Sequence, residues 1–343
     1  GGTIAAIYAG KALQQKNYNV TLEASSGNIS LIKECTNSGI TISICPSIPY
    51  IGDKEIEWIK EFDIVLVNVL NMMPCASIIS NFKPVVWWIH ESVGVDQLMV
   101  HKYNDFLSVD KLSKIQICAV SRIPQKLFNS NMENRVDAIL CYGIPDRRKE
   151  QKFHKNANKI IFAIIGGVCA AKGHDIFIKA VKKLKPEKKR NAEFWIIGKE
   201  NIDRYSQNIL EQVSLEPTIK ILGEKSREEI EILYSDIDVV VSASRADSLP
   251  IVMTEGMMYG KVCVASDVTG TLDYIEDGKN GFILPHENSD ALCERMEWII
   301  DNQDQMADIR KNARKTYEDY FTMEKFEVQL EKMIEEAKRK QKS

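Results

Sequence analysis

The chain has 343 residues, of which 44% are hydrophobic and 27% are charged, and its formal net charge is −3. This length allows two domains of ordinary size, and the composition is that of a soluble, globular protein. The slightly negative charge gives no basic field to attract nucleic acid, so we expect no nucleic-acid partner. No apolar run reaches the ~20 residues of a membrane-spanning helix, and no signal peptide precedes the fold.

The first part of the chain alternates short apolar runs with helical patterns. Near-continuous apolarity indicates parallel strands that are covered on both faces. The predicted strands are residues 18–22, 40–45, 62–67, 84–89, 115–120 and 138–142, and the predicted helices are residues 3–16, 29–38, 72–81 and 123–130. This pattern predicts a doubly wound α/β sheet.

The chain opens with Gly1-Gly2 directly before a predicted helix. A glycine turn of this kind normally follows a strand, and a parallel sheet does not easily lose a central strand. We therefore expect a short preceding segment to carry the missing first strand; the alternative is a Gly-Gly pair left by removal of a tag. The turn would let a phosphate or a sugar approach the helix N-terminus closely.

A polar run at residues 146–152 interrupts the pattern and is the predicted interdomain linker. A second α/β series follows, with predicted strands at residues 160–165, 194–197, 219–222, 239–241, 262–265 and 282–284, and a last helix at 322–340. We predict one Rossmann-like domain over residues 1–150 and a second over residues 151–320. A C-terminal helix over residues 321–343 can pack back on the first domain.

Eight cysteines are spread singly along the chain, without a CxxC pair or a His/Cys cluster. This spacing argues against a zinc site, and single cysteines favour a reduced, cytoplasmic compartment. The lysine-rich end at residues 338–342 can weakly favour anionic lipid. Any membrane association would therefore be peripheral, at the inner face of the membrane.

Polar or glycine-rich loops follow several predicted strands. Ligands of open α/β sheets bind beyond the carboxyl ends of the strands, so the cleft between two such domains is the expected site. His90 directly follows one strand; a single His is more often structural, but this position favours a functional role. Gly166-Gly167 follow another strand, and Lys172 stands where the next helix begins. This arrangement suits an anionic diphosphate, although the spacing is not that of a P-loop.

Two carboxylates, Asp247 and Glu255, flank the turn Ser248-Leu249-Pro250. Asp247 can simply complement a helix dipole, but Glu255 lies more than one turn inside an apolar helix, where a carboxylate needs a partner. Pro250 suits the first helical position, so the free N–H groups of that helix should point into the site. The two oxygens of Glu255 suit paired hydroxyls such as those of a ribose.

These pieces in this order resemble the retaining glycosyltransferases of the GT-B fold, specifically family GT4, also called glycosyl transferases group 1. The resemblance covers nearly the whole chain and is strongest over residues 159–320. The matching motifs are Ile165-Gly166 with Lys172-Gly173-His174-Asp175, Ile196-Ile197-Gly198, Leu222-Gly223, Asp247-x7-Glu255 with Gly256-Met257 and Gly260, and Asp277-Gly278 with Gly281. The implied fold is GT-B, with two Rossmann-like doubly wound domains facing a central cleft.

The resemblance implies a nucleotide-sugar donor, a UDP- or GDP-sugar, bound mainly by the C-terminal domain. It also implies a glycan or glycolipid acceptor on the N-terminal side, no cofactor and no metal. By this resemblance Lys172 neutralises the donor diphosphate, Glu255 holds the ribose and Asp247 contacts the donor sugar. His90 would approach that sugar, and Gly1-Gly2 would lie near the phosphates or the acceptor. The donor-binding loops would also include Gly166, Gly167, Arg245, Ser248, Leu249 and Pro250.

The chain departs from the family pattern at two positions. The family usually has an Arg five residues before the Lys, where this chain has Gly167, and Asp247 replaces the commoner Glu. Arg245 could supply the missing positive charge by touching the donor, or it could pair with Asp247 or Asp267.

Three functions are therefore compared. The first is a retaining transferase for surface polysaccharide or glycolipid synthesis, in which the leaving phosphate helps to deprotonate the acceptor. The second is a catalytically silent binding partner in a glycosylation complex, which the missing Arg favours slightly. The third is a sugar-nucleotide epimerase, which the arrangement of Lys172, Asp247 and Glu255 disfavours.

Overall fold

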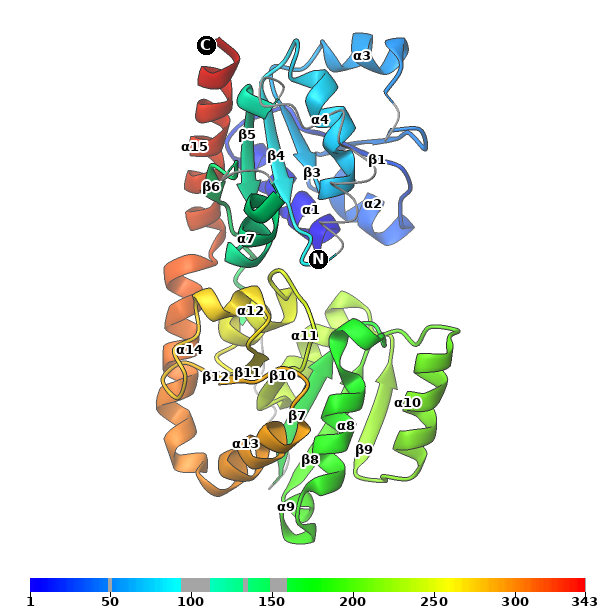
Figure 1. Ribbon diagram of the computed structural model, residues 1–343, viewed down its shortest axis with the longest axis vertical. Coiled ribbons are helices and arrows are strands. Elements are labelled where there is room, and N and C mark those ends of the chain that lie inside the picture. The colour runs from blue at the N-terminus through cyan, green and yellow to red at the C-terminus, as the bar shows by residue number, and fades with distance from the viewer. Residues whose placement is uncertain (49–50, 94–111, 132–134, 149–158, 343) are drawn as a thin grey trace. The chain divides into compact units, whose positions relative to one another are not determined.

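The computed structural model describes residues 1–48, 51–93, 112–131, 135–148 and 159–342 (Figure 1). The chain divides into two compact units. Unit 1 comprises Gly1–Ile144 and Tyr320–Ser343, and unit 2 comprises Pro145–Asp319. The predicted linker is described only as far as residue 148, and its residues 149–152 lie outside the described residues.

Unit 1 contains parallel strands in two sheets, ordered β1-β2 and β3-β4-β5-β6. Its strands are β1 Thr21–Ala24, β2 Thr41–Ile44, β3 Val65–Asn68, β4 Val85–Ile89, β5 Ile115–Ala119 and β6 Ala138–Ile139. Its helices are α1 Gly2–Gln15, α2 Ile29–Asn37, α3 Asp53–Ile59, the 3-10 helix η1 Leu70–Met72, α4 Met73–Ile79, α7 Arg122–Asn131 and α15 Met323–Lys342. All six predicted strands are confirmed, although β1 begins three residues late and β6 has only two paired residues.

The core of unit 1 is built on β4, which is buried along its whole length. Trp87 and Trp88 are both 0% exposed, and because side chains alternate along a strand they cover opposite faces of the sheet. Trp87 packs edge-on against Phe128 of α7, and Trp88 stacks on Phe326 of α15. Each indole N–H donates to a backbone carbonyl, so the polar end of each ring is satisfied. The last helix of the chain is therefore part of the core of unit 1, as Figure 1 shows.

Unit 2 has one parallel sheet in the order β12-β11-β10-β7-β8-β9. Its strands are β7 Ile160–Ile165, β8 Ala192–Ile197, β9 Ile219–Gly223, β10 Val239–Ser242, β11 Val262–Ser266 and β12 Phe282–Leu284. Its helices are η4 Ala170–Lys172, α8 His174–Lys183, α9 Pro186–Arg190, α10 Arg204–Ser214, α11 Arg227–Asp236, α12 Ile251–Met258, η5 Gly270–Asp273, α13 Ser289–Asp301, η6 Gln303–Gln305 and α14 Met306–Tyr320. The six strands predicted for this part of the chain are confirmed.

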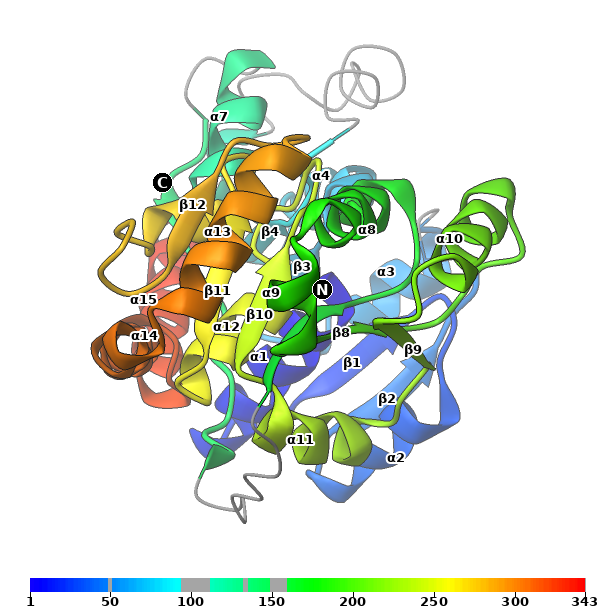
Figure 2. The same cartoon turned by 90° about the horizontal axis from the view of Figure 1, so that it is seen from below.

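The strand order of unit 2 reverses between β7 and β10. From β7 the chain moves outward to β8 and β9, and then returns to β10, β11 and β12. Because parallel crossovers are right-handed, this reversal sends α8 and α10 to one face of the sheet and α11 and α12 to the other (Figure 2). The carboxyl ends of β7 and β10 meet at the reversal point, which is where ligands of such sheets bind.

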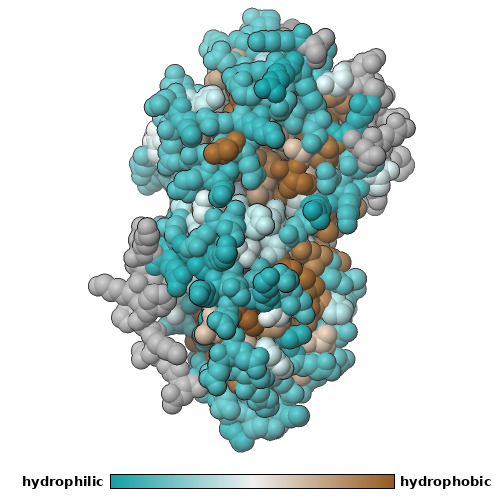
Figure 3. Space-filling model, turned by 90° about the vertical axis from the view of Figure 1, so that its left-hand side faces the viewer, coloured by the Kyte–Doolittle hydropathy of each residue, from teal (hydrophilic) through white to brown (hydrophobic). Residues whose placement is uncertain are grey.

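The start of unit 2 is anchored by Arg314 of α14. Its guanidinium donates to both carboxylate oxygens of Asp146, at 3.0 and 2.5 Å, and to the carbonyl of Met258 at 2.7 Å. The face of the molecule drawn in Figure 3 is mainly hydrophilic, with small apolar patches. Within the described ranges, no helix combines the length and the apolar character needed to span a bilayer.

We predict that Gly143→Ala destabilises unit 1 by roughly 1–3 kcal/mol, the usual cost of overpacking. A Cβ at Gly143 would lie 2.6 Å from Cβ of Phe326 and 2.7 Å from the carbonyl oxygen of Thr322, which forces α15 away from the core. The urea midpoint, followed by tryptophan fluorescence, measures the loss. Gly167→Ala is the control, because the nearest atom to its added Cβ is 3.9 Å away. Equal midpoints for the two variants would contradict the prediction.

Candidate functional site

The loops after β7 and β10 touch at the reversal point of the unit 2 sheet. Gly173 adopts a left-handed conformation with φ +72°, and a Cβ there would lie 1.9 Å from the carbonyl oxygen of Ala243. Only glycine can meet both conditions. The backbone N–H of Arg245 also donates to the carbonyl of Ala171 at 2.8 Å. These contacts fix the loop that carries Lys172 against the loop that carries Asp247.

Lys172 and Asp247 form an ion pair across these two loops. Their side chains are 34% and 13% exposed, so the pair is reachable from solvent. The carbonyl of Asp247 accepts from the N–H of Gly270, which attaches the loop after β11 to the same place. The structure thus brings together the two residues predicted to meet the diphosphate and the donor sugar. A cation and a carboxylate at this edge can bind a phosphate and a hydroxyl, respectively.

Glu255 lies inside α12 and is 8% exposed. Its Oε1 accepts from Nη2 of Arg227 at 3.1 Å, and its Oε2 accepts from the hydroxyl of Tyr234 at 3.2 Å. Burial raises the pKa of Glu255, and the charge of Arg227 and the Tyr234 hydrogen bond oppose that rise. Each carboxylate oxygen has a second lone pair, so Glu255 can still accept hydroxyls of a ligand. Both partners come from α11; the sequence indicated that a partner was needed but not which one.

The partner of Glu255 belongs to a longer chain of charges. Glu231 on α11 pairs with Arg147 and lies 3.7 Å from Nε of Arg227. Arg227 is therefore placed between two carboxylates, one of which is anchored to the segment where unit 2 begins. This arrangement fixes Arg227 and, through it, the orientation of Glu255.

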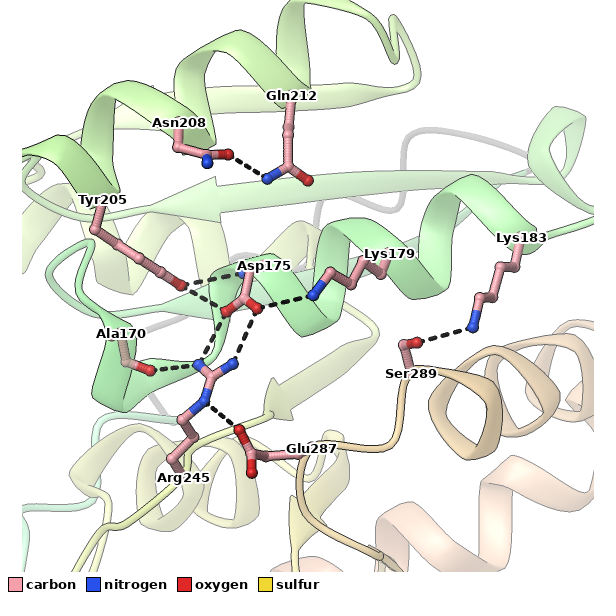
Figure 4. Close-up of polar contacts among 10 residues, drawn as sticks. All are labelled: Ala170, Asp175, Lys179, Lys183, Tyr205, Asn208, Gln212, Arg245, Glu287 and Ser289. Carbon is pink, nitrogen blue, oxygen red and sulfur yellow. Dashed lines mark hydrogen bonds and ion pairs between the residues drawn. The ribbon is translucent and has the colours of Figure 1, made fainter.

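Arg245 does not pair with Asp247 or Asp267, and that part of the sequence interpretation is wrong. Its guanidinium makes a two-pronged contact with Asp175, with both N···O distances 2.9 Å, and its Nε donates to Glu287 at 2.7 Å (Figure 4). Asp267 instead pairs with His286, 2.7 Å away. The sequence missed Asp175 as a partner because it lies 70 positions away from Arg245 in the chain.

Asp175 is held by more than one donor. The hydroxyl of Tyr205 donates to its Oδ1 at 2.8 Å, and Lys179 lies 3.3 Å from its Oδ2. Burial favours the neutral carboxyl, but the hydrogen bonds from Arg245 and Tyr205 outweigh it and hold the pKa of Asp175 well below its usual range. Asp175 therefore stays ionised at any ordinary pH.

The remaining predicted donor loop residues have distinct environments. Leu249 and Pro250 are buried, and Ser248 is half-buried. Pro250 is the N-cap of α12 rather than its first helical residue, because α12 begins at Ile251. Gly166 runs beneath Lys172, whose Cε would lie 3.7 Å from a Cβ added there, whereas Gly167 is exposed. The position of the missing Arg is therefore open rather than blocked.

In unit 1 the structure brings Gly2 and His90 together. Gly1 is the N-cap of α1, and a Cβ on Gly2 would lie 3.1 Å from Cγ1 of Val69 and 3.7 Å from Cγ of His90. The amide of Asn68 donates to the carbonyl of Gly2 at 3.1 Å. A larger residue at position 2 would require the Val69 side chain to shift by a few tenths of an ångström, because the ends of β3 and β4 lie close to the start of α1.

His90 is a half-buried, neutral imidazole whose Nε2 is shielded from solvent. Burial lowers its pKa to about 3, and its ring lies 4.4 Å from the ring of Trp88. Neither its Nε2 nor Oδ1 of Asn68 has a hydrogen-bond partner among the residues that the structure describes. Buried polar atoms of this kind usually serve a ligand or a bound water.

Val69, which directly follows Asn68 and lies with His90 beside Gly2, has a strained backbone. Its φ of +70° and ψ of 158° belong to a region that is essentially reserved for glycine and costs of order 1–3 kcal/mol. Two hydrogen bonds impose it: the N–H of Val69 donates to the carbonyl of Trp88, and the indole of Trp87 donates to the carbonyl of Val69, both at 2.9 Å. No feature of the sequence indicated this strain. That the residues of units 1 and 2 face one cleft stays a prediction.

No group of three or more His, Cys, Asp or Glu side chains that could hold a metal ion is found among the residues described. Two units built on parallel sheets, with polar loops at the carboxyl ends of the strands, are the build of a GT-B glycosyltransferase. The model of the family Glycosyl transferases group 1 matches residues 145–316, half of the chain, and the chain belongs to that family.

Three related sequences illustrate this membership. An uncharacterized glycosyltransferase of Methanocaldococcus jannaschii is 25% identical over 221 residues, 64% of this chain and 59% of the relative. An uncharacterized glycosyltransferase of Haemophilus influenzae is 22% identical over 356 aligned positions, 98% of this chain and 95% of the relative. The capsular polysaccharide biosynthesis glycosyltransferase CapM of Staphylococcus aureus is 24% identical, with 73% of this chain and 70% of the relative covered.

A solved structure has the same fold over its whole length. HepE of Anabaena, crystallised in complex with UDP and glucose, matches with a TM-score of 0.81 at 17% identity. The match covers 98% of this chain and 96% of HepE. The predicted GT-B fold is therefore confirmed.

We predict that Arg227→Gln destabilises the protein by about 3 kcal/mol at pH 8, because it leaves a buried carboxylate without the cation that contacts it. The pKa of Glu255 is raised above its ordinary 4.5 in the folded protein, so ionisation of Glu255 at pH values above 4.5 lowers the stability of the folded state. Losing Arg227 raises the pKa further, and the deficit should shrink as pH falls toward 4.5 and Glu255 takes up a proton. Urea unfolding at several pH values measures this effect.

The control for Arg227→Gln is Lys225→Gln, which removes a neighbouring cation whose partner, Glu229, is 53% exposed. An exposed pair of this kind contributes about 0.5 kcal/mol at most. A pH-independent loss in Arg227→Gln would contradict the role given to Glu255 ionisation.

Proposed function

We propose that this glycosyltransferase moves a sugar, with retention, from a UDP- or GDP-sugar to a hydroxyl of a glycan or glycolipid acceptor in surface polysaccharide synthesis. The ion pair of Lys172 with Asp247 at the reversal point of the unit 2 sheet is the observation that carries the proposal. The capsular polysaccharide relative of S. aureus supports the class of acceptor. The UDP and glucose bound by HepE support the class of donor.

Donor binding would exchange one ion pair for another. The diphosphate takes the ammonium of Lys172, and the carboxylate of Asp247 is then free to accept a hydroxyl of the donor sugar. Glu255 accepts the ribose hydroxyls, with Arg227 and Tyr234 holding it in place. The site becomes more negative by the charge of the diphosphate, because Asp247 stays in place as an acceptor when the ligand takes Lys172.

Transfer would begin with cleavage of the bond between the anomeric carbon and the diphosphate oxygen. Negative charge grows on the leaving diphosphate, where Lys172 and the N-terminus of α8 stabilise it. The acceptor oxygen bonds to the anomeric carbon from the same face, and its proton passes to the leaving phosphate oxygen. His90, neutral at any ordinary pH, would offer a hydrogen bond to a sugar hydroxyl rather than a charge.

One observation favours a second function. Gly167 leaves open the position where the family usually has an Arg, and Arg245 is engaged with Asp175 and Glu287. The diphosphate would then have one strong cation fewer than usual. A catalytically silent binding partner in a glycosylation complex is the alternative that this feature supports.

Titration calorimetry with UDP, GDP, ADP and the corresponding sugars tests the donor assignment. We expect Glu255→Gln to weaken a nucleoside and its diphosphate alike, by about tenfold, because the ribose contact is common to both. Lys172→Met should weaken only the diphosphate, by roughly 10- to 100-fold. Glu276→Gln is the control, since Glu276 is 67% exposed and pairs with Lys279.

The proposed donor site is wrong if no nucleotide binds, or if Glu255→Gln binds as the wild type does. Binding without turnover of any nucleotide sugar would favour the silent partner. Loss of turnover on addition of EDTA would contradict the metal independence that is part of the proposal.

For His90→Phe we predict a fall of roughly 100-fold in turnover with stability kept to within about 1 kcal/mol. Its Nε2 has no described partner, so a structural role would involve only packing, which Phe largely preserves. Steady-state kinetics with the nucleotide sugar identified by calorimetry and thermal unfolding measure the two effects. Retained turnover would remove His90 from the site, and a large loss of stability would assign it a structural role.

A further inference from the structure

Four of the five N–H groups of the Arg245 guanidinium donate to protein atoms. Its Nη1 donates to the carbonyl of Ala170 at 2.7 Å and to Oδ1 of Asp175 at 2.9 Å, and its Nη2 donates to Oδ2 of Asp175 at 2.9 Å. Its Nε donates to Glu287 at 2.7 Å. Figure 4 shows the side chain reaching from the loop after β10 to the start of α8, with Tyr205 closing the far side of Asp175.

These contacts bracket Lys172 in the chain. Ala170 lies two residues before Lys172 and Asp175 lies three residues after it, and Arg245 holds both. The carbonyl of the intervening Ala171 accepts from the backbone N–H of Arg245. The single 3-10 turn that carries Lys172 is thus fixed at both ends by one residue.

The charges around Arg245 make it a poor ligand for a diphosphate. Two carboxylates, Asp175 and Glu287, face one guanidinium, so the cluster has no surplus positive charge to offer. A donor phosphate would have to displace a two-pronged contact that a lysine or a water could not replace. The hydrogen bonds of Nη1 and Nη2 are made with residues 170–175, so the guanidinium is committed to that loop.

We infer that Arg245 is a positioning residue, which clamps residues 170–175 and thereby holds Lys172 where a nucleoside diphosphate meets it. This inference rests on the proposed function for the ligand of Lys172. It differs from the direct donor contact that the sequence predicts, and the two roles give opposite expectations when the partners of Arg245 are altered.

The decisive variant is Asp175→Asn, which releases Arg245 without removing it. If Arg245 touched the donor, releasing it would leave the affinity for UDP unchanged or raise it. The clamp predicts instead that Asp175→Asn weakens UDP about tenfold, as Arg245→Lys does, because Lys keeps the charge but not the fork. The double variant should bind as weakly as either single variant, since both break the same contact. Uridine affinity should be unchanged throughout.

The matched control is Lys183→Met, which removes a charge from the same helix at its other end. Among the described residues Lys183 pairs with Asp290 and Ser289, and none of its hydrogen bonds or ion pairs involves Asp175, Arg245 or Glu287. UDP affinity should be unchanged in this variant. A tenfold loss there would mean that general charge, rather than the clamp, controls binding, and would overturn the inference.

Hydrogen exchange without nucleotide separates failure of the clamp from failure of the proposed function. Amides 170–175 should exchange at least tenfold faster in Asp175→Asn and Arg245→Lys than in the wild type. Unchanged exchange, or UDP affinity retained in Asp175→Asn, overturns the clamp. If exchange accelerates but the wild type binds no nucleoside diphosphate, the clamp stands and the proposed function fails. Thermal unfolding verifies that each variant is folded, and Arg245→Lys alone decides the matter if Asp175→Asn is not.

Discussion

The contact of Gly173 with the carbonyl of Ala243 is the constraint on which the geometry of unit 2 depends. It joins the loops after β7 and β10 at the point where the strand order reverses, and no larger residue fits there. Lys172 immediately precedes this contact, and Asp247 follows it by four residues. The packing of these two backbone segments therefore fixes the distance between Lys172 and Asp247. Rigid backbone support of this kind holds the side chains of a site in place accurately enough for chemistry.

Three carboxylates near this point are each paired with a cation from another element: Glu255 with Arg227, Asp175 with Arg245 and Asp247 with Lys172. A tyrosine hydroxyl reinforces each of the first two pairs: Tyr234 of α11 donates to Glu255, and Tyr205 of α10 donates to Asp175. In the part of the chain that the structure describes, the ion pair with Asp247 is the one polar contact of the Lys172 ammonium. A ligand would open that pair at the lowest cost, because the other two are embedded in networks whose members would all lose partners.

Much of this arrangement could be predicted from local sequence. Continuous apolar runs located the strands, and glycines and polar residues directly after them located the loops, because both signals act within a few residues. The partners could not be found in this way. Arg227 and Tyr234 lie 28 and 21 positions from Glu255, and their contact depends on how α11 packs beside α12. Arg245 likewise pairs with Asp175, and not with Asp247 two residues away in the sequence, because α8 places Asp175 next to its guanidinium.

The polar residues of the two units differ in character. Unit 2 presents charged side chains in pairs. Around His90 the atoms shielded from solvent, Nε2 of the imidazole and the side-chain Oδ1 of Asn68, are neutral, and the carboxylate of Glu91 accepts from the backbone N–H of His90. An ionised group shielded in this way would carry a large desolvation penalty, while neutral polar atoms can be matched one by one by hydroxyls. The strained peptide at Val69 is held by Trp87 and Trp88, which are among the largest fully buried side chains of the unit. The tryptophan core of unit 1 therefore does more than support its sheet, because it also fixes the backbone beside the shielded polar atoms of Asn68 and His90.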